Sequence, residues 1–246
     1  MLTVARSPHD GESRDRGRSV EQGEATGRLV LVIDPDAQEK VPGLWATGFV
    51  VEKLESPPES PGLPDPTRCV PEDVDLESLK DHPVAAAYRK LSWGVGIDPT
   101  KNRPAGEALA RRILQGKPLP EIHPLVDAYN LASARTLVPL GAYDLDRMAP
   151  PLTVRRAGQG LTFHGIGREP EQLDENRIAY VDSEGQVCGV FLWRDAHETR
   201  VRQDSKRVLV TAVGGDPLSV QTGLSALSAV AEFAALVGWR PEDPPA

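Results

Sequence analysis

An α+β fold is the fold class that the sequence predicts, because helical patterns gather in the middle of the chain and strand patterns gather after them. Apolar residues recur at helical spacing through 104–137, whereas short apolar runs with turn residues between them fill 152–213. The 246 residues suffice for one large domain with tails. Residues 1–27 carry mixed charge and almost no large apolar groups, so we expect a disordered tail there, one domain over 28–240 and a C-terminal tail over 241–246.

The first part of the domain is expected to begin with two strands. Residues 28–33 form a short apolar run that ends at an Asp-Pro pair, and 45–54 form a second run. A proline-rich loop is expected over 56–65. The pattern of 73–93 is helical but broken near His82, so that Pro83 is expected to open a second helix.

Three further helices are predicted from the proline, glycine and capping residues at their ends. One spans 104–114, with a proline in its first turn and a glycine just past its end. Another begins after His123 and runs to 137, where a proline and a glycine end it. The last spans 218–237, with Asp216 as its cap and Pro217 at its first position.

Strands are predicted for the segment between the last two helices. Residues 183–185 (Ser-Glu-Gly) fit a hairpin turn between two of these strands. The five predicted strands are 152–156, 161–164, 177–182, 187–193 and 207–213.

Charge and composition limit the classes of function. The net charge of −8 argues against a general polyphosphate or DNA binder. The charge is uneven, however: 36–81 has 4 Lys/Arg against 11 Asp/Glu, while 89–156 has 11 Lys/Arg against 6 Asp/Glu. The start of the chain lacks the apolar stretch of a signal peptide, and no run is long enough to span a membrane, so we expect a cytoplasmic protein without a membrane partner.

Familiar catalytic and metal-binding motifs are absent from the sequence. The phosphate-binding loop, the dinucleotide-binding glycine pattern, the nucleophile elbow and the zinc-protease motif are all missing. Cys69 and Cys188 are far apart, and Cys188 lies in an apolar run typical of the core. The histidines show no ligand spacing, so we expect no metal and no cofactor. Residues 195–198 (Asp-Ala-His-Glu) fit an acid–base or metal site, but a solvated loop is the favoured interpretation.

Two stretches of the chain carry a resemblance to a known family. They match in order over many positions, so that the resemblance covers residues 28–238. The first comprises 88–90, 96–104, 107–109, 111–112, 118–130 and 139–146, and the second comprises 180–182, 187–188, 191–195, 199 and 204–206. These stretches resemble stand-alone proteins related to the B3/B4 domain, the tRNA-binding and editing module of the phenylalanyl-tRNA synthetase beta chain.

The resemblance implies a sandwich-like sheet core with packed helices and a pocket between them. In the synthetase that pocket receives the tRNA 3′ end and hydrolyses tyrosine wrongly attached to phenylalanine tRNA. Asn130 matches an Asn of the synthetase, whereas Gly141 stands where the synthetase usually has a His and Thr211 where it has a Glu. The glycine-rich loop of the synthetase pocket falls on 193–196, which is not glycine-rich here. The resemblance therefore implies a pocket with a different lining.

Six residues are the candidates for substrate binding, and each has a structural alternative. Lys101 and Arg103 follow a turn and could hold a phosphate or carboxylate, or pair with Glu107 or Asp98. Arg194 could face the ligand or pair at a sheet edge with Asp195. Asn130, Ser133 and Thr199 are the polar candidates that could position a water, although isolated hydroxyl and amide groups are common on surfaces and at caps.

Two hypotheses for function follow from the resemblance. The first is a deacylase that hydrolyses mischarged aminoacyl-tRNA, acting on its 3′ end without being a complete synthetase. It would position a water and the ester through polar groups, with Asn130, Arg194 and Thr199 as candidates. The second is a non-catalytic module that binds tRNA or a small amino-acid-like ligand, which the Gly141 and Thr211 differences favour. A hydrolase or binder of another small acylated metabolite is a third class that the sequence does not exclude.

Overall fold

A computed structural model describes residues 5–6, 31–56, 59–60 and 62–242. The tail expected over 1–27 lies outside these residues apart from Ala5–Arg6, which form the short strand β1. The helices are α1 Pro35–Lys40, α2 Pro83–Gly94, α3 Ala105–Leu114, α4 Pro124–Thr136 and α5 Val220–Ala235, with 3₁₀ turns at Pro66–Cys69 and Leu79–Asp81. The remaining strands are β2 Leu31–Ile33, β3 Trp45–Lys53, β4 Leu140–Asp144, β5 Leu152–Arg156, β6 Thr162–Phe163, β7 Glu171–Gln172, β8 Ile178–Val181, β9 Val187–Val190, β10 Arg194–Asp195, β11 Arg207–Gly214 and β12 Trp239–Pro241.

The strands form two main sheets, which confirms the predicted α+β class. One sheet has the order β1-β2-β5-β8-β9-β10, and the other has the order β12-β3-β11-β4. A small third sheet pairs β6 with β7. The pairs β1–β2 and β2–β5 are parallel and the rest are antiparallel. Strands β4 and β10 therefore lie at the edges of their sheets.

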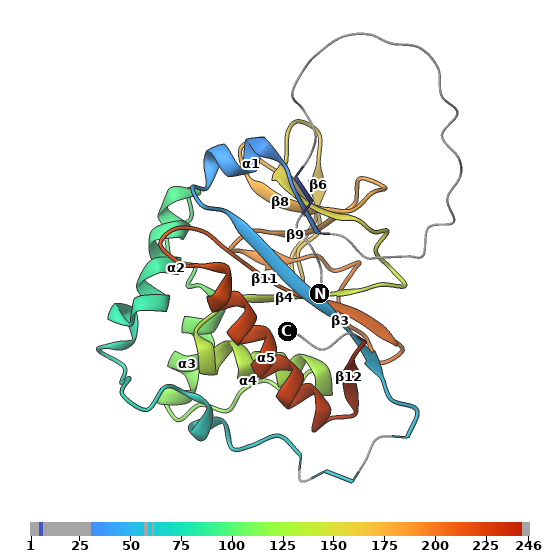
Figure 1. Ribbon diagram of the computed structural model, residues 1–246. Coiled ribbons are helices and arrows are strands. Elements are labelled where there is room, and N and C mark those ends of the chain that lie inside the picture. Colours follow the sequence, from blue (N-terminus) through green and yellow to red (C-terminus); the bar gives the residue numbers. More distant parts are fainter. Residues whose placement is uncertain (1–4, 7–30, 57–58, 61, 243–246) are drawn as a thin grey trace.

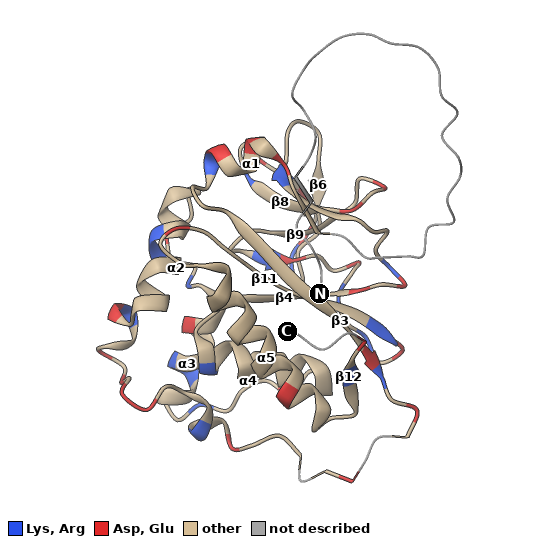
Figure 2. Ribbon diagram, viewed as in Figure 1, with Lys and Arg blue, Asp and Glu red and all other residues tan. Residues whose placement is uncertain are grey.

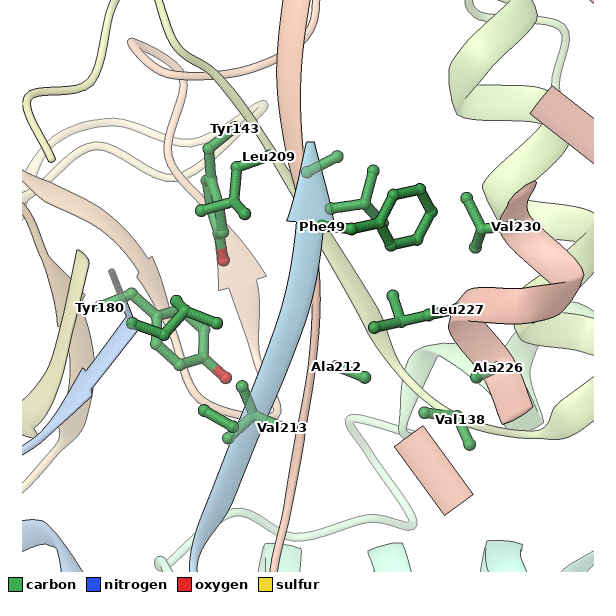
Figure 3. Packing of buried hydrophobic residues seen from close by; sticks show 14 of the residues in the cluster. Phe49, Val138, Tyr143, Tyr180, Leu209, Ala212, Val213, Ala226, Leu227 and Val230 are labelled. Carbon is green, nitrogen blue, oxygen red and sulfur yellow. The ribbon is translucent and has the colours of Figure 1, made fainter. Parts of the chain in front are cut away.

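The four-stranded sheet is the middle layer of the molecule. Helix α5 packs across β3 and β11 on one face, with α4 beside it (Figure 1). On this face Phe49 lies toward Leu227 and Val230, whereas Leu209 points to the opposite side, where it lies beside Tyr143 (Figure 3). Since side chains alternate along a strand, both faces of the sheet are buried. The layers are thus helices, four-stranded sheet and six-stranded sheet, a sandwich-like core with packed helices.

The buried cluster at the centre joins all three layers. It draws residues from Leu31 near the start to Trp239 near the end of the described chain. Figure 2 shows that α5 and the first part of β3 are almost free of charged residues, which lie mainly in loops and at the ends of elements. Burial of these apolar faces is the main stabilising contribution to the fold. Among the described residues, no helix has the length and apolar content that crossing a membrane requires.

Several predicted elements differ from those observed. The helical pattern before His82 gives turns and one 3₁₀ turn rather than a helix, and α2 begins at Pro83. Helix α5 begins at Val220 after Ser219, not at Pro217. The reason is a turn in front of it, in which the N–H of Leu218 donates to the carbonyl of Gly215 at 2.9 Å.

The predicted strand 187–193 also ends early. Strand β9 stops at Val190, and Leu192 adopts a left-handed backbone with φ 56°. The chain then reverses, so that Arg194 and Asp195 pair back onto Val190 and Gly189 as β10. The predicted hairpin turn at 183–185 is confirmed, with Gly185 at φ 86°. The reversal after Val190 matters because it carries the next side chains into the space between the sheets.

Candidate functional site

A cavity of about 150 Å³ lies where the edge strands of the two main sheets approach each other. Strand β4 contributes Leu140 and Gly141, and the neighbouring β11 contributes Thr211 and Val213. The opposite wall is built by Tyr180 of β8, by Val190 at the end of β9 and by 192–195, which include β10. Arg103, just ahead of α3, borders the same cavity. The cavity therefore combines apolar walls with a few polar groups, as small-molecule sites do.

The carboxylate of Asp195 is the main polar group inside the cavity. The Tyr143 hydroxyl donates to one of its oxygens at 3.0 Å. Burial raises the pKa of Asp195 to about 7, although the Tyr143 hydroxyl and the backbone N–H of Ala142 act in the opposite direction. The carboxyl is thus poised between its two protonation states near neutral pH, a property that is common at functional sites. The interpretation of 195–198 as a solvated loop was wrong for Asp195, because β10 folds back onto β9 and partly buries its side chain.

Gly141 and Thr211 face each other across the floor of the cavity. They are partners in the register of β4 and β11. A Cβ atom at Gly141 would lie 2.6 Å from the hydroxyl oxygen of Tyr143 and 3.1 Å from Oγ1 of Thr211. The Tyr143 hydroxyl therefore fills the space that a side chain at Gly141 would need. A histidine at this position does not fit beside Tyr143 in its present orientation.

Two arginines supply positive charge to the cavity. Arg194 donates from Nη1 to the carbonyl of Ile166 at 2.6 Å, while its buried Nε has no partner among the described residues. The Nε of Arg103 lies 3.6 Å from the carboxylate of Glu107 one turn along α3, so the ion pair weighed from the sequence is present. Arg103 is also exposed enough for its remaining N–H groups to reach a ligand.

The other four candidates from the sequence lie elsewhere. Lys101 is exposed in the loop before α3. Asn130 lines a different hollow, of about 520 Å³, between α4, the end of α3 and the proline-rich loop. Ser133 is buried and donates to the carbonyl of Val138 at 2.6 Å. Thr199 is fully buried, with its hydroxyl 3.4 Å from the carbonyl of Cys188. The structure thus brings Arg103 and Arg194 together at one cavity and separates them from the rest.

Sequence reasoning missed Asp195 and Tyr143 as members of the site. Both lie in stretches that carry the family resemblance, which is the signal that could have pointed to them.

Two histidines lie side by side near the cavity. His164 stacks on His197 with ring centroids 4.7 Å apart, and Nδ1 of His164 lies 2.7 Å from the carboxylate of Glu198. Within the described part of the chain, no group of three or more His, Cys, Asp or Glu side chains is arranged to hold a metal ion.

Comparison with known proteins identifies the family. A beta subunit of phenylalanine–tRNA ligase from Tropheryma whipplei (strain Twist) is 29% identical over 126 residues, which are 50% of this chain and 13% of that protein. An N-terminal fragment of the phenylalanyl-tRNA synthetase beta subunit from Pyrococcus horikoshii aligns with 92% of this chain and 52% of its own, at 16% identity and a TM-score of 0.47. This chain therefore spans only a small part of the ligase subunit that it matches. The family model of the B3/4 domain matches residues 87–233, which include every residue that lines the cavity, and the chain belongs to the B3/4 domain family.

Proposed function

We propose that this chain binds the 3′ end of an aminoacyl-tRNA and hydrolyses the ester that holds a wrongly attached amino acid. Membership of the B3/4 family supports the link to tRNA, since the ligase subunit that the chain matches belongs by name to an enzyme that acts on tRNA. The chain covers 13% of that subunit, and the proposal concerns hydrolysis of the ester and not the ligase reaction. Charged tRNA is a cytoplasmic substrate, and a cytoplasmic location is part of the proposal.

The observation that carries the proposal is the meeting of three distant segments at one cavity. Gly141, Thr211 and 193–196 are the places to which the resemblance assigns the synthetase pocket. Gly141, Thr211 and 193–195 line the cavity between the sheets. Segments up to about seventy residues apart in the sequence thus converge on the expected site, which supports a retained pocket with an altered lining.

The chemistry that the cavity supports is the positioning of an ester and a water. In the hydrolysis, the water oxygen attacks the carbonyl carbon, the bond from that carbon to the ribose oxygen breaks, and a proton passes to the ribose oxygen. We propose that Arg194 stabilises the charge that develops on the carbonyl oxygen and that Arg103, with Lys101 beyond it, holds phosphate. Ser133 and Thr199 would act indirectly, through the buried backbone that they support.

The experiment is a deacylation assay with excess protein and a panel of charged tRNAs. The panel includes phenylalanine tRNA charged with tyrosine and tRNAs charged with small noncognate amino acids. We expect accelerated loss of the ester for at least one noncognate pair over the rate without protein. Spontaneous rates across the whole panel would overturn the proposed hydrolysis.

A non-catalytic binding module is the second candidate. No histidine is present among the described residues that line the cavity, and Gly141 and Thr211 replace the two polar groups that the resemblance expects. Such a module would bind charged tRNA without shortening the life of the ester. Its affinity for tRNA should fall as salt rises, because phosphate contacts release counterions. Affinity that does not change with salt would contradict both tRNA-based candidates.

A further inference from the structure

Asp195 is a carboxylate inside the cavity without a cationic partner among the described residues. Its neighbour Arg194 donates instead to the carbonyl of Ile166, and the Arg103 guanidinium lies beside Glu107. Both cations of the cavity are therefore engaged with other groups. A partly buried carboxylate that lacks a counter-charge costs free energy unless a ligand supplies one.

The carboxylate is held in a fixed position by its surroundings. The hydroxyl of Tyr143 donates to Oδ1 of Asp195. Gly189 on the neighbouring strand makes room for this pair, since a Cβ there would lie 3.0 Å from Oδ1 of Asp195 and 3.1 Å from the Tyr143 hydroxyl. The Tyr143 ring is fixed in turn by an edge contact with Tyr180, with centroids 6.2 Å apart. Residues of three neighbouring strands thus hold the Asp195 carboxylate in one orientation toward the cavity.

We propose that Asp195 binds the free α-ammonium group of the aminoacyl moiety and so restricts the substrate to amino-acid esters with an unmodified amine. This inference rests on the proposed function, because it names the group by which an aminoacyl-tRNA is recognised. The opposite charges of the cavity fit such a substrate. The ammonium meets Asp195, the carbonyl oxygen meets Arg194, and Arg103 suits the phosphodiester beyond the ester.

The size of the cavity narrows the substrate class further. A volume of about 150 Å³ is close to that of a cavity known to hold a benzene molecule. The ammonium, the α-carbon and the carbonyl group occupy much of that space. The remaining room favours glycyl, alanyl or seryl groups over aromatic ones. The Tyr143 hydroxyl also occupies the space in front of Gly141, where a Cβ would lie 2.6 Å from it.

The test uses a pair of non-hydrolysable probes that differ only at the amine. One probe is 3′-amino-3′-deoxyadenosine acylated with alanine, and the other is the same molecule with an N-acetyl group on the alanine. Calorimetric titration of the full chain should show weaker binding of the acetylated probe by roughly ten- to a hundredfold, the range for loss of a hydrogen bond to a charged group. Asp195→Asn should weaken binding of the free-amine probe by a similar factor and leave the acetylated probe unchanged.

The control is Asp146→Asn, which removes the same charge from an exposed site outside the cavity. It should bind both probes as the wild type does. Equal binding of the two probes, no binding of the free-amine probe at millimolar concentration, or an Asp195→Asn variant that binds it normally would overturn the inference. An Asp195→Asn variant that keeps its affinity but loses deacylation would likewise overturn it, and would make Asp195 a general base.

The two proposals fail in different ways. Binding of the free-amine probe that depends on Asp195, in a protein that accelerates no deacylation, would refute the hydrolysis and leave the ammonium site in place. Deacylation at equal rates for alanyl-tRNA and N-acetyl-alanyl-tRNA would support the hydrolysis and refute the ammonium site.

Discussion

Replacement of Asp195 by asparagine should stabilise the folded protein at neutral pH. Burial raises the pKa of Asp195 to about 7, from an ordinary value of 3.8. The folded state therefore opposes ionisation of this carboxyl, whereas the unfolded chain does not. Asparagine has nearly the same shape, and its side-chain oxygen can still accept the hydrogen bond from Tyr143. The variant thus removes the cost of a buried charge and keeps the local geometry.

The magnitude follows from the size of the pKa shift. A difference of about three pKa units between the folded and unfolded states corresponds to at most about 4 kcal/mol. Because the folded-state pKa is the higher one, the contribution of the carboxyl to stability is fully present below about pH 4 and is lost as pH rises to about 7. The stability gained by Asp195→Asn over the wild type should therefore be near zero at the acidic end. This gain in stability should grow as pH rises from about 4 to about 7 and stay constant at higher pH.

The assay is urea unfolding of both proteins, followed by tryptophan fluorescence at about pH 4.5, 6 and 8. Asp75→Asn is a control for which the opposite change in stability is expected. The backbone N–H and hydroxyl of Ser78 and the N–H of Glu77 donate to this exposed carboxylate and lower its pKa. That variant should lose stability by nearly the same amount at all three pH values, because the contribution of Asp75 is lost only as pH falls below about 3.8. A gain for Asp195→Asn that does not vary with pH, or a loss of stability at about pH 8, would refute the reasoning.

Three other predictions follow from the packing. Gly141→Ala should cost about 1–3 kcal/mol, because the new Cβ would lie 2.6 Å from the Tyr143 hydroxyl, and the added change Tyr143→Phe should recover most of that loss in urea unfolding. Ser133→Ala should lower the free energy of unfolding by about 1–2 kcal/mol through loss of its hydrogen bond to the carbonyl of Val138, while the deacylation rate of the folded protein stays unchanged. A slower deacylation without a loss of stability would contradict this structural role. Burial raises the pKa of Cys188 to about 12, so iodoacetamide should label it at mildly alkaline pH only after unfolding, as mass spectrometry would reveal.

The helices were predictable because their boundary signals are local. Prolines at the start of α2 and α4 and the glycine after α3 mark those helices in the sequence itself. Strand β4 was not predicted. Its residues 140–144 form a short, weak pattern, and they become a strand through pairing with β11, more than sixty residues away. The first turn of α5 was misplaced because a turn at 215–218 uses the Asp-Pro pair that resembles a helix start.

The candidate site could be predicted only in part. The resemblance placed Arg194, Gly141 and Thr211 near one pocket, and the structure brings them together. Asp195 was not predicted as a site residue because the sequence around it is typical of a polar loop. Its partial burial depends on the reversal of the chain after Val190. Its contact with Tyr143 joins residues 52 positions apart, a pairing that no local pattern contains. Asn130 was expected in the pocket, yet helix α4 presents it to a separate hollow.

The central claim is that the cavity between the sheets is the place where aminoacyl-tRNA is hydrolysed. The most direct test is a single-turnover deacylation assay that compares Arg194→Ala with Asn130→Ala, since Arg194 lines this cavity and Asn130 lines the other hollow. We expect Arg194→Ala to slow ester loss by roughly ten- to a hundredfold or more, and Asn130→Ala to retain the wild-type rate. A wild-type rate in Arg194→Ala together with a slow Asn130→Ala would place the chemistry in the other hollow and contradict the claim.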